Sequence, residues 1–388
     1  MINSITAYDI EAVKKKLAVA KVKTWYKGKL ITSDQYSSIQ TAYETNLFSP
    51  SIIIRVLLFI ATYLGLSTIV GPIALMVGDA GMGAIRVMLF ITGAGMMAFV
   101  ERILIKDKHH FKSGVTEAGY YSGLAFIYFG LLGFEINEPL FYLIAALILL
   151  AVASIRYLDL LSLISAMGCL LAIIFLSLES ILSVLPFAIM IVFAVLFAVS
   201  QPIQKKLDYL IWEDHFIIFD TLSLLLVYLG GNYFVVRELS IEMMNLSLAE
   251  GQDIPFAFLF YGFTLIIPIA YLVWGIKQKS MLFIRVSLIV IALSVITIKY
   301  YYSLGHPEIT VTVAGAVLIL VSLLLIKYLK KNRNGFIRDQ IFKSKWDNTD
   351  LAAFIASQSL GGHQINESES AITGQGGEFG GGGASGEF

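Results

Sequence analysis

The sequence predicts an all-α fold: a polytopic helical membrane protein with about ten transmembrane helices and a small N-terminal helical cap. Two observations predict this class. Of the 388 residues, 57% are hydrophobic and 14% are charged, whereas a water-soluble domain carries about 45–50% apolar and about 25% charged residues. The apolar residues also gather in continuous runs of about 20, which is the length that an α-helix needs to cross a bilayer.

Ten apolar runs are candidate spans, and they divide the chain into a membrane domain (residues 51–327) and flanking segments. The runs cover residues 51–78, 81–100, 118–134, 139–155, 157–177, 180–200, 216–233, 255–276, 281–303 and 308–327. The third, fourth and fifth runs lie close together along the chain, so one of them could be re-entrant. The loop at 234–254 carries Leu239, Met243 and Leu246 at helical spacing, which predicts a short interfacial helix.

Residues 1–50 are polar and rich in lysine, and they predict a cytosolic cap of two helices. Asp9 can cap the first helix, whose apolar residues recur at three- and four-residue spacing from Ile10. Gly28 fits the end of this helix, and Thr32 with Gln35 forms a capping box that begins the second. No short apolar run ends at a small-residue cleavage site, so we expect the first span to act as an uncleaved signal anchor.

Lysine and arginine alternate between the loops on the two sides of the membrane, which predicts that both termini are cytoplasmic. The N-terminal segment, the 101–117 loop and the later connections on that side are basic, as is the stretch from Lys327 to Lys345. The opposite connections are acidic or neutral, and the 234–254 loop holds Arg237 as its only basic residue. Ten spans agree with this pattern because both ends then lie on one side.

Four charged side chains lie about one turn inside the predicted cytoplasmic boundary, and they form a candidate intramembrane polar site. Arg55 is in the first span, Asp159 in the fifth, Asp220 in the seventh and Arg285 in the ninth. Charges inside a bilayer are costly and mark functional sites by default. The two positive and two negative groups could pair, either to fix helix packing or to form a substrate or proton site, and both interpretations stay open.

Glycine and proline predict irregular helix at four positions within the spans. Gly71 and Pro72 lie in the first span, Pro186 in the sixth and Pro268 in the eighth. Broken helices of this kind line binding sites in many transporters. A cavity at the midplane lined by Gly71, Pro72, Pro268 and Asp220 would favour transport, whereas a closed bundle would favour a role in protein interaction.

The motifs of several enzyme and binding classes are missing, so the sequence favours a non-enzymatic protein. It has no GxxxxGK[ST] loop, no HExxH motif, and no histidine deep within a span. We therefore expect no catalytic residue, no metal and no cofactor. The 28 basic residues balance the 28 acidic ones, which argues against a nucleic-acid partner. The single cysteine, Cys169, cannot form an internal disulfide.

The C-terminal region divides into two segments. Residues 328–360 form a basic segment in which a short helix is expected over 349–360. Residues 361–388 are rich in glycine and serine, which predicts a disordered tail. Phe379 and Phe388 each follow a Gly-Glu pair and are typical of a short recognition motif on a flexible tether, although a plain spacer stays open.

The N-terminal region resembles a known family. Trp25, Gly28, Ile31, Gln35 and Ile39, followed directly by many spans, resemble a pattern in uncharacterised bacterial multi-pass membrane proteins of the domain-of-unknown-function 2157 type. The resemblance covers about the first 75 residues and the general architecture. It implies a bacterial cytoplasmic (inner) membrane protein, and it supplies no catalytic residue.

The end of the chain, GGGGASGEF, resembles the glycine-rich tails of bacterial membrane proteins of the TPM-domain type, which often end in an aromatic residue as Phe388 does. The TPM domain itself has no counterpart here, so no activity carries over. We expect an interaction or assembly protein that contacts the lipid bilayer and engages a protein partner through its cytosolic ends. A homo-oligomer stays open, and the alternative function is a secondary transporter with a polar site in the inner half of the bundle.

Overall fold

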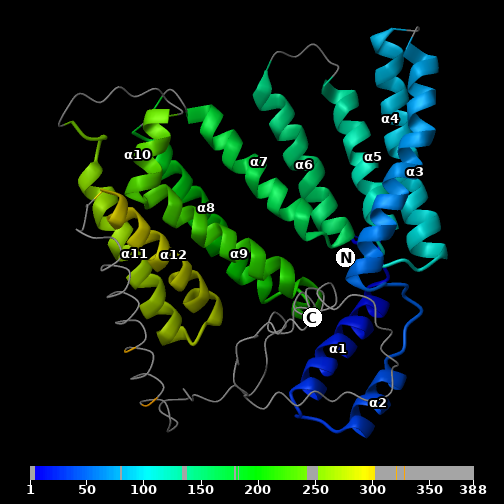
Figure 1. Cartoon of the computed structure of the whole chain (residues 1–388), viewed down its shortest axis with the longest axis horizontal. Coiled ribbons are helices and arrows are strands. Elements are labelled where there is room, and N and C mark those ends of the chain that lie inside the picture. Colours follow the sequence, from blue (N-terminus) through cyan, green and yellow to red (C-terminus); the bar gives the residue numbers. More distant parts are fainter. Residues whose placement is uncertain are drawn as a thin grey trace, which may run out of the picture. The chain divides into compact units, whose positions relative to one another are not determined.

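Figure 1 shows the chain in a computed structural model, which describes residues 5–78, 81–132, 138–178, 181, 183–242, 252–301, 320 and 327. These residues form helices and no strand. The elements are α1 (Ile10–Lys27), α2 (Ser33–Ala42), α3 (Ile52–Gly78), α4 (Met82–Phe99), the π-helical segment η2 (Val100–Asp107), α5 (Val115–Leu132), α6 (Pro139–Tyr157), α7 (Leu160–Leu178), α8 (Leu185–Gln204), α9 (Tyr209–Gly231), α10 (Tyr233–Glu242), α11 (Ala257–Gln278) and α12 (Met281–Tyr301).

The prediction of a helical, multi-pass membrane protein agrees with this architecture. Among the described residues, six helical stretches are long and apolar enough to cross a membrane: Met82–Asp107, Pro139–Tyr157, Leu160–Leu178, Leu185–Gln204, Ala257–Gln278 and Met281–Tyr301. The first nine predicted spans each overlap a helix, and the closely spaced third to fifth spans form α5, α6 and α7. The total of ten spans and the side on which the termini lie stay predictions.

Several predicted features fall outside the described residues. They are most of the tenth span, the basic segment and tail from residue 328 onward, and Phe379 and Phe388. The short helix expected after α9 is present as α10, which contains Leu239, whereas Met243 and Leu246 also lie outside the described residues.

Consecutive helices pair as hairpins, and α9 joins several of them. The pairs are α4 with α5, α6 with α7, α8 with α9, and α11 with α12, as Figure 1 shows for the ribbons. Helix α3 packs on α5, whereas α9 contacts α7, α10, α11, α12 and α1.

Many apolar side chains point away from these contacts, such as Ile91 (67% exposed) and Ile266 (63% exposed). Faces of this kind suit contact with a lipid bilayer.

Glycines allow the close approach of α4 and α5. A Cβ atom on Gly93 would lie 2.7 Å from the Gly123 carbonyl oxygen, and one on Gly130 would lie 2.9 Å from the Phe90 ring. Small residues at crossings of this kind let helix backbones approach within the membrane, where van der Waals packing drives helix association.

The predicted helix breaks do not end any helix, which corrects that expectation. Helix α3 continues through Gly71 and Pro72, and α11 continues through Pro268. Pro186 lies at the first turn of α8 rather than inside it. A proline fits there because the first N–H groups of a helix have no partner within the helix.

Helix α11 compensates for Pro268 through its neighbour α12. A proline cannot donate a hydrogen bond to the carbonyl four residues earlier, which here belongs to Thr264. The hydroxyl of Ser294 on α12 donates to this carbonyl oxygen at 2.8 Å. A side chain on the paired helix therefore satisfies the acceptor that the proline leaves free, so the helix can run on.

The cap forms as the sequence predicts. Asp9 accepts a hydrogen bond from the Glu11 N–H at the start of α1, and α1 ends at Gly28. Thr32 and Gln35 make both bonds of the capping box at the start of α2. The first turns of α1 bury Ile10 and Val13 in a cluster with side chains of η2, α5, α6 and α9. The cap is therefore packed on the membrane domain at the beginning of α1.

Candidate functional site

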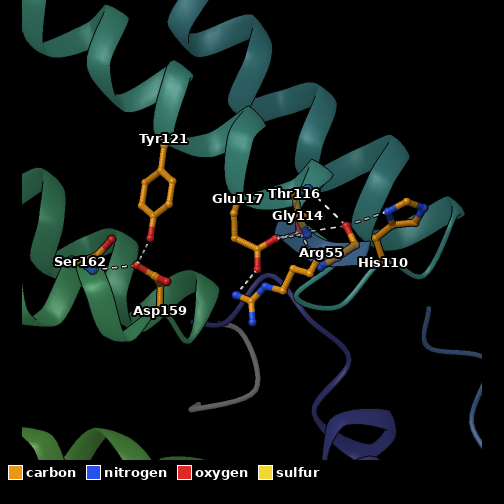
Figure 2. Close-up of polar contacts among 9 residues, drawn as sticks. Arg55, His110, Gly114, Thr116, Glu117, Tyr121, Asp159 and Ser162 are labelled. Atoms are coloured by element: carbon orange, nitrogen blue, oxygen red, sulfur yellow. Dashed lines mark hydrogen bonds and ion pairs between the residues drawn. The ribbon is translucent and has the colours of Figure 1, made fainter. Parts of the chain in front are cut away.

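A polar site near the cap contains an ion pair between α3 and α5. The Arg55 guanidinium forms this pair with the Glu117 carboxylate (Figure 2). Glu117 is buried, and its Oε2 atom accepts hydrogen bonds from the Gly114 N–H and the Thr116 hydroxyl, both at 2.7 Å. Glu117 lies in the first turn of α5, where the helix dipole also favours a negative charge.

The loop before α5 adopts a conformation that requires glycine at position 114. Gly114 has a φ of +89°, and a Cβ atom there would lie 2.0 Å from the Arg55 carbonyl oxygen. The Thr116 N–H donates to the Ser113 hydroxyl oxygen at 3.3 Å, and the Ser113 N–H donates to the Thr116 hydroxyl at 3.4 Å. These reciprocal bonds begin the helix, and the bare glycine lets α3 cross directly over the loop.

A two-bond backbone bridge ties the same loop to the segment before α3. The Phe48 N–H donates to the His109 carbonyl at 2.9 Å, and the Phe111 N–H donates to the Phe48 carbonyl at 2.9 Å. The His110 ring packs against the Phe48 ring at a centroid distance of 4.9 Å. Its Nδ1 atom lies 3.0 Å from the Ser113 hydroxyl, with which it forms a hydrogen bond.

We expect acid to weaken this bridge through His110. Burial lowers the pKa of His110 below its ordinary value, while the Glu117 carboxylate opposes this shift. As the pH falls, His110 therefore takes up a proton in the unfolded chain before it does so in the folded protein. The contribution of His110 to the free energy of unfolding is complete above the ordinary histidine pKa, and it declines as the pH falls towards the lower pKa of the folded protein. Thermal unfolding between about pH 8 and about pH 5 should show this slope. His110→Gln should reduce this dependence of stability on pH, whereas the control His109→Gln, at an exposed position, should leave it unchanged. Equal slopes in the two variants would contradict the role of His110.

Asp159 lies directly before α7, because this helix begins at Leu160 rather than at residue 157, where the fifth span was predicted to start. Its Oδ2 atom accepts hydrogen bonds from the Ser162 N–H and from the Tyr121 hydroxyl, both at 2.7 Å (Figure 2). Aspartate is favoured at the N-cap because its carboxylate satisfies a free backbone donor. Leu158, with a φ of +51°, makes the turn that ends α6.

A second ion pair connects the cap to η2 and α6. The Arg156 guanidinium contacts both carboxylate oxygens of Glu101, and the Tyr157 hydroxyl donates to Glu101 at 3.0 Å. The Arg156 carbonyl accepts from the Ala7 N–H at 2.8 Å, and its guanidinium donates to the Ile5 carbonyl at 3.3 Å. The chain before α1 is thus held directly by this pair.

Tyr8 lies in the same junction, between the cap and the membrane helices. Its ring packs edge-on against Phe111 at 5.0 Å. Burial raises the pKa of the Tyr8 hydroxyl, and the carboxylates of Glu117 and Asp159 raise it further. The hydroxyl therefore remains protonated, and both carboxylates belong to its surroundings.

Salt bridges between α1 and the start of α9 complete the junction. Lys14 lies 3.0 Å from Asp208, and Lys21 lies 3.3 Å from Glu213. The hydrogen bond to Asp208 raises the pKa of Lys14. Because these pairs are exposed, they contribute orientation more than stability.

Asp220 occupies a separate polar cluster between α8 and α9. The carboxylate is buried in α9 and accepts hydrogen bonds from three side chains of α8. The donors are the Ser200 hydroxyl at 2.5 Å, the Gln201 amide at 3.1 Å and the Gln204 amide at 2.7 Å. These neutral donors lie one turn of α8 apart or less, so they converge on one carboxylate.

The four charges predicted to share one depth therefore have different surroundings. Arg55 pairs with Glu117, Asp159 caps α7, and Asp220 binds α8, whereas Arg285 lies on an exposed face of α12. The sequence did not indicate Glu117 as the partner of Arg55, because the predicted third span begins at residue 118, one residue after Glu117. The signal was available: Gly114 followed three residues on by Glu117 fits the N-terminal pattern of a helix.

Three clefts stand out in the described part of the chain. One of about 400 Å³ lies between α1, residues 44–47 and the end of η2. A groove of about 480 Å³ separates α1 from α2, and an apolar crevice of about 170 Å³ lies among α7, α8, α9 and α10. None of these three is lined by Gly71, Pro72, Pro268 or Asp220, and the described residues hold no group of three metal-ligating side chains.

We compared the chain with models of protein families, with curated proteins and with solved structures, and none of these matches it.

Proposed function

We propose that this chain is a non-enzymatic interaction or assembly protein of a bacterial cytoplasmic membrane, which binds a partner protein through its N-terminal cap. The proposal includes ten spans with both termini in the cytoplasm, as the alternation of basic loops indicates. It also includes membership of the domain-of-unknown-function 2157-type family that the cap resembles.

The observation that carries the proposal is the contrast between the two ends of the cap. The beginning of α1 is buried and held by Glu101, Arg156 and the α9 salt bridges. By contrast, α2 buries none of its residues. Trp25 and Tyr26 in the last turn of α1 and Leu30 after it are 36–45% exposed. A cap that is fixed at one end and leaves aromatic surface free at the other suits recognition of another protein.

The groove between α1 and α2 indicates the chemistry of the partner. Lys16 and Lys23 line one wall, and Tyr36 and Tyr43 line the other. Residues 1–50 carry seven lysines against four acidic residues, a net charge of +3. A partner segment with apolar side chains flanked by acidic ones matches this surface in both respects.

A crosslinked pull-down from native membranes tests the proposal in the full-length chain. Lys23→Glu combined with Trp25→Ala should lower the yield of specific partners about tenfold. Lys15→Glu is the matched control, because Lys15 is an exposed lysine of α1 outside the groove. Partner yields that are equal for the double variant and the wild type would contradict the proposal.

A third variant, Phe379→Ser with Phe388→Ser, separates the tail from the cap. Partners lost only in this variant would assign recognition to the C-terminal end. Partners lost only in the Lys23–Trp25 variant would assign it to the cap.

The alternative function, a secondary transporter, rests on the Asp220 cluster. A buried carboxylate surrounded by neutral donors within a bundle can bind a proton or a cation. The same geometry also serves helix packing, since the three donors fasten α8 to α9.

We expect Asp220→Asn to destabilise the protein by about 1–3 kcal/mol, because an amide replaces one acceptor and then faces the amide donors of α8. Thermal unfolding in detergent measures this loss. Ser223→Ala is the control on the same helix, because the buried Ser223 hydroxyl has no hydrogen-bond partner among the described residues. Unchanged stability of Asp220→Asn, together with lost proton-coupled flux in proteoliposomes, would instead favour the transporter.

A further inference from the structure

The apolar crevice among α7, α8, α9 and α10 lies at the end of the α8–α9 hairpin that is far from the cap. Its walls include Leu185 and Pro186 at the start of α8, Leu229 at the end of α9, and Leu239 on α10. Helix α7 packs mainly on α6 and α8 packs mainly on α9, and the two hairpins meet less closely, where α7 contacts α8 and α9. Helix α10 packs on α9 and α11 and forms one wall of this space.

The lining chemistry excludes a polar ligand. Ser240 is the one residue with a polar side chain among those that line the crevice. Its hydroxyl already donates to the Val236 carbonyl at 2.6 Å. A water-soluble molecule would lose its hydration on entry and find no hydrogen-bond partner. An apolar occupant gains dispersion contacts there without this cost.

Exposed apolar side chains lie close in the sequence to the residues of α8 that line the crevice. Ile181 and Val184, which directly precede α8, are 49% and 46% exposed, and Ile191 on α8 is 62% exposed. Helices α7 and α8 are both long and apolar enough to cross the membrane. The crevice therefore lies on helices whose outer faces suit the hydrocarbon part of the bilayer.

We propose that this crevice binds part of one acyl chain of a membrane lipid. The occupant is a single chain because about 170 Å³ is less than the 300 Å³ or more of an ordinary small-molecule pocket. The inference goes beyond the proposed function and does not depend on it, because the crevice lies at the opposite end of the α8–α9 hairpin from the cap.

Photocrosslinking of the full-length protein tests this proposal. The protein is placed in phosphatidylethanolamine–phosphatidylglycerol vesicles that contain a phosphatidylethanolamine with a diazirine on its acyl chain. After illumination, adducts are mapped by mass spectrometry of peptides. We expect adducts on peptides of α10 and the start of α8 that level off as the probe fraction rises, whereas adducts around Ile191 rise in proportion.

A crevice-filling variant sharpens the test. Leu239→Trp should lower the α10 adducts about tenfold because the indole occupies the space of several methylenes. Ile191→Trp is the control, since it adds the same side chain to an exposed face. Val235→Phe fills the crevice from another position on α10 if Leu239→Trp does not fold. Adducts on α10 that rise in proportion to the probe, or that are unchanged in folded filling variants, would overturn the proposal.

Discussion

Gly114→Ala is expected to destabilise the protein by about 2–5 kcal/mol and to loosen the contact between α3 and α5. Alanine at a φ of +89° costs about 1–2 kcal/mol by itself. The added Cβ would also lie 2.0 Å from the Arg55 carbonyl oxygen, so the α3 backbone must shift to accommodate it. Overpacking of this kind costs about 1–3 kcal/mol more. Thermal or denaturant unfolding in detergent measures the total.

Gly65→Ala provides the matched control for this prediction. Gly65 lies in α3, and no heavy atom lies within 4 Å of the position that its Cβ would take. Alanine should therefore be neutral or slightly stabilising there, because it raises helix propensity. If Gly114→Ala unfolded at the same temperature as Gly65→Ala, the described crossing of α3 over the loop would be wrong.

Arg55→Met is expected to cost about 2–3 kcal/mol. The substitution leaves the buried Glu117 carboxylate with two hydrogen bonds and without its cation, and removal of one partner of a buried pair usually costs about 3–5 kcal/mol. We expect less here because the Arg55 side chain is 36% exposed, so water screens part of the interaction. The measurement is the free energy of unfolding in detergent.

The double variant Arg55→Met with Glu117→Gln tests the cause of this loss. Glutamine can still accept the hydrogen bond from the Gly114 N–H but carries no charge, so the double variant should be more stable than Arg55→Met alone. Double-mutant cycles isolate such coupling when the residues touch. If the two substitutions were additive, the ion pair would have no energetic role.

The local features of the cap could be predicted from the sequence because short-range rules govern them. Asp9, Gly28, Thr32 and Gln35 act through bonds within a few residues of themselves, and each takes the predicted place. The same holds for the helices, because an apolar run of sufficient length has few alternatives in a bilayer.

The polar site could be predicted only in part, because side-chain pairing depends on contacts between distant helices. The position of Arg55 in an apolar run marks it as a candidate, but its partner Glu117 lies 62 positions away in the sequence and outside the predicted span. Pro268 was expected to break its helix. The replacement donor, Ser294, lies on another helix and carries no local signal of that role.

The docking of α1 on α9 has a consequence for the order of events during synthesis. The bonded residues Lys21 and Glu213 are 192 positions apart. A ribosome that adds about 5–20 residues per second completes this stretch in roughly 10–40 s. The cap is thus made first, but its partner residues at the start of α9 are made only after the first six predicted spans. During that interval the lysines and the apolar face of α1 can contact other molecules. Helix α9, once made, then competes with those molecules for the same residues of α1.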